Sequence, residues 1–195
     1  MIILFLVLFF IGVLFLLVII FRIIEPAYLL FFNKPLFIFW HPVLNKLNEA
    51  DKTILRREFP FYLNLSEKKK GYFEHRVKCF IDHYNFDGKD IEVLQEMKLI
   101  IAGTYIMLTF GMRTYLLELF ENIIIYPSVY YSTINQEYHK GEYNPRMKSV
   151  VFSWEDFLSG HQTKDNINLG LHEFTHVLHF YSRKSSDAGA VIFYD

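Results

Sequence analysis

The sequence predicts an α+β fold, in which a small sheet packs on helices and a transmembrane helix precedes the folded domain. An uncharged apolar run over residues 1–21 indicates the transmembrane helix. Apolar residues at helical spacing over 67–84 and 91–110 predict two helices of the domain. Short apolar runs at 123–126 and 149–153 predict buried strands.

These elements divide the chain into a transmembrane anchor at 1–24, an interfacial or juxtamembrane segment at 25–54, and a folded domain at 55–195. The 20 Lys and Arg side chains nearly balance the 21 Asp and Glu side chains, and the net charge of −1 argues against a nucleic-acid partner. The single cysteine, Cys79, leaves no intrachain disulfide and fits a reducing compartment.

The N-terminal run is long enough to cross a bilayer, because 21 helical residues span roughly 31 Å at 1.5 Å per residue. A cleaved signal peptide is the alternative, but neither a basic segment before the run nor a small-residue cleavage site after it is present. Basic residues follow the run, beginning with Arg22. The positive-inside rule therefore predicts a single-pass protein of the inner (plasma) membrane, with its N-terminus outside and its domain in the cytoplasm.

Residues 26–40 are apolar and aromatic but contain Pro26 and the pair Lys34-Pro35. We expect this interrupted segment to lie at the membrane interface, with a membrane hairpin as the alternative.

Within the domain, Ser66 is the expected N-cap of the helix at 67–84, and Asp87-Gly88 is an expected turn. Residues 131–148 are expected to form a loop, and 154–158 a short helix. A further helix over 169–180 is expected to be capped by Asp165 or Asn166.

That last helix carries the sequence His172-Glu-Phe-Thr-His176. Two histidines four residues apart project from one face of a helix and can bind one metal ion, while Glu173 can reach a bound water. Zinc in such a site lowers the pKa of its water to about 7. Two solvated histidines on a surface helix are the alternative. Because apolar residues surround the motif, we expect a mostly buried helix whose polar groups need a partner, and a Zn²⁺ ion supplies it.

Several segments together resemble the Mlc titration factor A family of zinc peptidases over about residues 55–180. They read EFPFYLNLSEKKK at 58–70, IIIYPSVY at 123–130, GEYNPRMKSVVFSWEDFLSG at 141–160 and NINLGLHEFTHVLHF at 166–180. The resemblance implies a zincin-like metallopeptidase core with aminopeptidase-type activity on peptides. It also implies zinc ligands at His172 and His176, a catalytic base at Glu173, and a transcriptional regulator as a partner.

Two departures from the family pattern stand out. His179 occupies a position where the family usually has Asp, and the family's third zinc ligand is a Glu on a later helix, beyond Asp195. We therefore expect a fragment of a longer protein, or a truncated relative with an impaired site. His179 shares the ligand face, but His172 and His179 are about 10.5 Å apart along the helix axis, which suits a supporting role better than ligation.

The sequence thus predicts a membrane-anchored zinc metallopeptidase that hydrolyses peptides with metal-activated water. The run 149–153 is the expected edge strand that holds substrate, and His139 and His161 are expected in loops that border the cleft. Two alternatives stay open: a non-catalytic zincin-like binding or regulatory module, and a membrane structural protein in which the motif is accidental.

Overall fold

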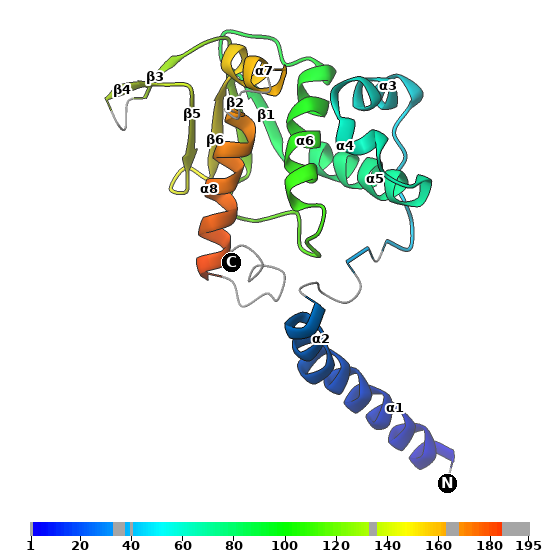
Figure 1. The fold of residues 1–195 in the computed structure, drawn as a ribbon. Coiled ribbons are helices and arrows are strands. Elements are labelled where there is room, and N and C mark those ends of the chain that lie inside the picture. The colour runs from blue at the N-terminus through cyan, green and yellow to red at the C-terminus, as the bar shows by residue number, and fades with distance from the viewer. Residues whose placement is uncertain (1, 33–37, 40, 133–135, 163–167, 185–195) are drawn as a thin grey trace.

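A computed structural model describes residues 2–32, 38, 39, 41–132, 136–162 and 168–184 (Figure 1). The helices are α1 Ile2–Ile19, the π-helical turn η1 Ile20–Ile24, α2 Glu25–Phe32, α3 Glu49–Glu58, α4 Pro60–Leu63, α5 Glu67–His83, α6 Gln95–Thr109, α7 Trp154–Gln162 and α8 Leu169–Lys184. The strands are β1 Asn85–Gly88, β2 Asn122–Tyr126, β3 Tyr130–Ser132, β4 Glu137–His139, β5 Gly141–Asn144 and β6 Ser149–Ser153.

The N-terminal helix is long and apolar enough to cross a membrane over Ile2–Ile24. No residue of α1 is buried, and the helix extends away from the folded domain (Figure 1). The expected interruption at Pro26 is wrong, because the chain stays helical through α2. Pro26 has no backbone N–H to donate to the helix. The wider π-helical turn η1 lies directly before α2, the helix that contains this proline. The pair Lys34-Pro35 falls outside the described residues.

The main sheet has four strands in the order β1-β2-β6-β5. β1, β2 and β6 run parallel, and β5 pairs antiparallel with β6. The prediction that 149–153 is the edge strand is therefore wrong: β6 lies between two strands, and all its residues are buried. The strand at that edge is β5, within the segment that was expected to be a loop.

Short polar strands account for the other differences from the predicted elements. β1 includes the expected turn at Asp87-Gly88, and β3 pairs with β4 in a separate two-stranded hairpin within residues 131–148. The predicted runs 123–126 and 149–153 are confirmed as β2 and β6, and the helix predicted at 67–84 is confirmed as α5. Helices with a small mixed sheet agree with the predicted α+β class.

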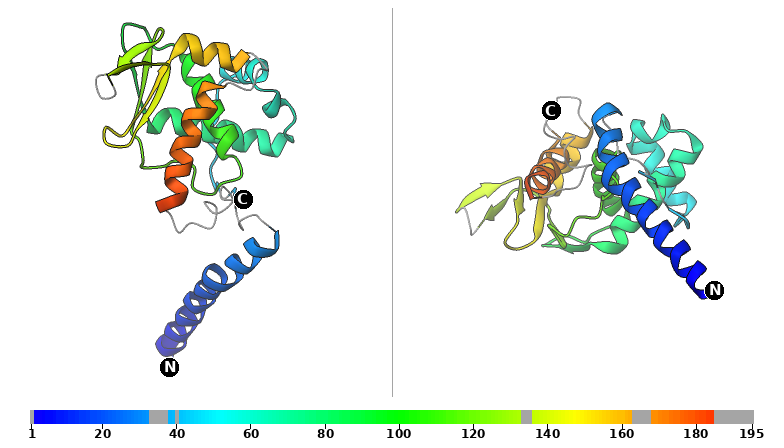
Figure 2. Two further views of the ribbon diagram at one scale, coloured as in Figure 1. Left: turned by 60° about the vertical axis from the view of Figure 1, so that its left-hand side comes forward. Right: turned by 90° about the horizontal axis from the view of Figure 1, so that it is seen from below.

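The core centres on α6, which packs against α3, α5 and α8 (Figure 2). Most of its residues from Met97 to Thr109 are buried. Phe80, Tyr105 and Phe174 bring α5, α6 and α8 together through aromatic contacts, with ring centroids 4.8–6.3 Å apart. This packing fixes α8 against the inner face of the sheet. Leu47 and Leu55 are also buried in this core.

Arg76 of α5 is fully buried and ties the segment before the domain to the core. Its guanidinium donates hydrogen bonds to the carbonyl oxygens of Met112 at 2.9 Å, Phe110 at 3.2 Å and Ile38 at 2.9 Å. It also lies over the ring of Tyr115, 4.4 Å from the centroid. Carbonyl dipoles and an aromatic face thus satisfy the buried charge, in place of a carboxylate.

Candidate metal centre and adjoining pocket

Asn168 is the N-cap of the motif helix α8 and directly precedes its first residue, Leu169. The Asn168 Oδ1 accepts a hydrogen bond from the Leu171 N–H at 2.9 Å, and its carbonyl oxygen accepts one from the His172 N–H at 2.9 Å. The cap is therefore two or three residues later than expected, and Asp165 and Asn166 lie outside the described residues. Because the cap fixes the first turn of α8, it also fixes the rotation of the histidines that follow.

The two motif histidines converge as ligands of one ion would. Their Nε2 atoms are 3.1 Å apart, and the rings are nearly perpendicular at 86°. Two imidazole nitrogens on a tetrahedral zinc ion, at 2.0–2.1 Å each, are about 3.3 Å apart. The separation of the two Nε2 atoms is therefore close to that of two ligands of one zinc ion.

The expectation that these histidines are buried is wrong. His172, His176 and His179 all lie on the exposed face of α8, while Phe174, Val177 and Leu178 form the buried face. Partial burial and the neighbouring His172 and His179 lower the pKa of His176, which favours the neutral imidazole that a metal requires. Among the described residues, no group of three or more His, Cys, Asp or Glu side chains could hold a metal, so His172 and His176 are the two candidate ligands in this part of the chain.

Glu173 differs from the histidines because it is buried, with 6 % of its surface exposed. It turns toward the edge strand β5, where a Cβ atom on Gly141 would lie 2.9 Å from its Cγ and Oε1. Only glycine permits so close an approach. Burial raises the pKa of Glu173, while His172 and a hydrogen bond from the Tyr143 backbone N–H oppose the rise. The group is thus a sheltered carboxylate next to the candidate metal ligands.

The free edge of β5 presents backbone groups beside Glu173. The Lys140 carbonyl oxygen accepts a hydrogen bond from the Ser153 N–H at 2.6 Å. In an antiparallel pair every second residue bonds to the neighbouring strand, so the backbone groups of Glu142 and Asn144 also face β6. The backbone groups of Gly141 and Tyr143 therefore point outward. α8 lies along this same strand, so the open edge and the motif adjoin.

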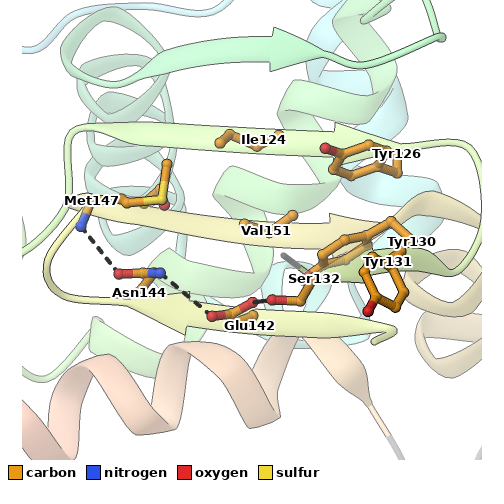
Figure 3. A pocket seen from close by; sticks show the side chains of 10 residues that line it. Ile124, Tyr126, Tyr130, Tyr131, Ser132, Glu142, Asn144, Met147 and Val151 are labelled. Carbon is orange, nitrogen blue, oxygen red and sulfur yellow. Dashed lines mark hydrogen bonds between the residues drawn. The ribbon is translucent and has the colours of Figure 1, made fainter. Parts of the chain in front are cut away.

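A pocket of about 120 Å³ lies on the other face of the sheet, lined by residues of β2, β3, β5 and β6 (Figure 3). At its centre, the Glu142 carboxylate accepts hydrogen bonds from Ser132 Oγ at 3.1 Å and Asn144 Nδ2 at 3.4 Å. The stacked rings of Tyr126 and Tyr130, 4.6 Å apart, form one wall. The pocket is therefore acidic and aromatic.

Several of these residues are absent from the sequence-based prediction, notably Glu142, Tyr130 and Gly141. All three lie in the segments that resemble the family, which gave them no role, and the residues Gly141–Asn144 are too few for their alternation to identify a strand. His139 does adjoin the site, because its imidazole lowers the pKa of Glu173. His161 does not border a cleft with the motif. It contacts Glu58 at 3.2 Å and the ring of Phe59, between α7 and the N-terminal helices.

Comparison with known proteins supports the interpretation of the motif. No curated protein sequence matches the chain. The family described as glucose-regulated metallo-peptidase M90 matches residues 43–187, which include every element from α3 to α8. This is the family of the Mlc titration factor A proteins, so the resemblance seen in the sequence segments is confirmed. With its paired motif histidines and sheltered carboxylate inside the matched region, this chain belongs to the M90 family of metallopeptidases.

Proposed function

We propose that this protein is a zinc-dependent peptidase in which His172 and His176 bind the metal and Glu173 is the catalytic base. The observation that carries the proposal is the 3.1 Å separation of the two Nε2 atoms beside a buried carboxylate. Membership of a metallopeptidase family supports the reaction class. A third ligand from outside the described residues completes the site in this proposal.

The zinc ion, when bound, lowers the pKa of water to about 7 and polarises the scissile carbonyl. Glu173 accepts a proton from the attacking water and returns it to the leaving amine. Burial suits Glu173 to this task, because a raised pKa brings a carboxylate closer to the operating pH. The Tyr143 N–H and the close contact with Gly141 hold the carboxylate in place.

The peptide substrate binds in this proposal along β5, in place of the strand 149–153 considered from the sequence. The backbone groups of Gly141 and the carbonyl oxygen of Tyr143 face outward and can pair with an extended peptide, whereas the Tyr143 N–H already bonds to Glu173. A peptide in that position lies between β5 and the exposed histidines of α8. Its scissile bond then lies near Glu173.

The test is the substitution Glu173→Gln, which keeps the size of the side chain and removes its basicity. We expect hydrolysis of a fluorogenic peptide library to fall by a factor of about 10² to 10⁴, with zinc content unchanged by elemental analysis. Glu155→Gln on the exposed side of α7 is the matched control. Undiminished hydrolysis by Glu173→Gln would show that this carboxylate is not the base.

Zinc content separates the enzyme from a non-catalytic binding module. A complete site keeps about one zinc per chain through dialysis, whereas two histidines alone do not. We expect His172→Ala to abolish retention. A wild-type chain that loses its zinc on dialysis and hydrolyses no peptide supports the binding module.

We also propose that Ile2–Ile24 anchors the protein in the plasma membrane with the domain on the cytoplasmic side. The hydropathy of this helix and the basic residues that follow it support this orientation. The full chain is expected to stay with membranes after alkaline carbonate extraction, and protease added to intact spheroplasts should leave the domain uncut. Recovery in the soluble fraction would contradict the anchor.

A further inference from the structure

The pocket beside β5 holds two buried hydroxyl groups that no described residue pairs with. Tyr130 is 8 % exposed and Ser149 is 1 % exposed, and both line the pocket. Neither hydroxyl oxygen has a hydrogen-bond partner within the described part of the chain. Buried polar groups are nearly always satisfied by protein or water, so these two hydroxyls leave hydrogen-bonding capacity at one pocket that a bound polar group can use.

The charge in the pocket indicates the chemistry of that ligand. The two oxygens of Glu142 accept hydrogen bonds only from neutral donors, Ser132 Oγ and Asn144 Nδ2 (Figure 3), and no described cationic side chain pairs with it. The stacked rings of Tyr126 and Tyr130 stand beside it. A carboxylate without a counter-ion next to aromatic faces is suited to a protonated amine.

The pocket and the candidate metal centre lie on either side of one short strand. Glu142 follows Gly141, against which Glu173 packs. Burial raises the pKa of the Tyr130 hydroxyl, and the negative charges of Glu142 and Glu173 both raise it further. Tyr130 is therefore close to both carboxylates, and an amine beside it would be near a peptide bond positioned at Glu173.

We propose that this pocket is a substrate subsite in which the Glu142 carboxylate binds a protonated amine of the peptide, from either its N-terminus or a lysine side chain. The inference rests on the peptidase function proposed above. The hydroxyl oxygens of Tyr130 and Ser149 accept hydrogen bonds from the remaining N–H groups of the ammonium. Glu142 is thus a specificity residue for the positively charged group and takes no part in proton transfer.

Peptide binding is measured by calorimetry on the full chain in detergent. Every protein in the series carries Glu173→Gln, so that the peptide is not hydrolysed. The probes are trialanine amide, its N-acetyl form, N-acetyl-Ala-Lys-Ala amide and the same peptide with acetyl-lysine. We expect Glu142→Gln to weaken one amine-bearing probe about tenfold to a hundredfold and to leave its acetylated counterpart unchanged. The affected probe identifies the source of the amine. The matched control is Glu137→Gln, an exposed carboxylate on the nearby strand β4.

Tyr130→Phe and Ser149→Ala keep the inference testable if Glu142→Gln destabilises the fold. Each removes a hydroxyl that has no partner among the described residues, so the urea midpoint should stay the same or rise. Amine binding should nevertheless weaken severalfold. If a variant loses stability and binds all four probes more weakly by the same factor, the proposed amine subsite is wrong.

Hydrolysis separates this inference from the function on which it rests. The ratio of kcat/KM for free-amine and acetylated peptides should fall toward one in Glu142→Gln. Wild-type hydrolysis with no preference between the two overturns the amine subsite and leaves the peptidase intact. Amine-dependent binding through Glu142 without any hydrolysis supports the subsite and overturns the peptidase.

Discussion

At the residue scale, His172 and His176 share one face of α8, as histidines four residues apart on a helix must. The apolar residues of the motif helix suggested burial on all sides. In the structure, Phe174 and Val177 face the core, and the histidines face outward. The buried member of the motif is Glu173, because its position turns it toward β5.

His41 makes stability depend on pH. Burial, and to a smaller extent the neighbouring His75 and Arg76, together lower its pKa from 6.5 to about 4. Between about pH 6.5 and 4, the unfolded chain therefore binds more protons at this residue than the folded chain. Stability should fall as the pH is lowered through this range and, for this residue, level off below about pH 4.

The measurement is the urea midpoint of the full chain in detergent between pH 7 and pH 4. His41→Gln should flatten the decline, because the substituted residue cannot take up a proton. His75 contributes in the same direction, since burial also lowers its pKa. His83→Gln on the exposed end of α5 serves as the control. An identical slope in wild type and His41→Gln would rule out this origin.

At the element scale, long periodic segments were predictable and short polar strands were not. α5, β2 and β6 carry apolar residues at the spacing of a helix or in a continuous run. β5 is four residues long, and only pairing with β6 makes it a strand. This pairing is also why the edge strand was wrongly assigned to 149–153, since an apolar run cannot show which of its neighbours is another strand.

The contact between α8 and β5 depends on Gly141. A methyl group there would lie 2.9 Å from Glu173 and from Leu169 Cδ1, so Gly141→Ala must displace one or both. We expect peptide hydrolysis to drop by about tenfold to a hundredfold and the free energy of unfolding to fall by about 1 to 3 kcal/mol. Zinc content should be unchanged, because His172 and His176 lie on the exposed face.

Gly111→Ala is the control for this substitution, since a methyl group at Gly111 meets no atom within 4 Å. Steady-state kinetics and urea unfolding of both variants give the comparison. Full activity in Gly141→Ala would mean that the position of Glu173 does not depend on this contact.

At the scale of the whole molecule, the fold class and the metal motif follow from the sequence, but the neighbourhood of the motif does not. The class needs only the types of element, and the motif lies within one helix. The pocket needs residues 130–144 to fold back beside a sheet whose central strand, β6, comes later in the chain. No local pattern reports such an arrangement, because the contacts join residues far apart in sequence.

The outward position of the motif histidines has a consequence for how the protein acquires its metal. The aromatic core around α6 and α8 contains neither histidine, so the domain holds its shape through packing that involves no ligand. In the proposed zinc enzyme, the domain can therefore fold before the metal binds, unlike small zinc-dependent folds that are unstructured until the ion arrives. The supply of zinc, rather than the amount of protein, then sets how much of the proposed enzyme is active.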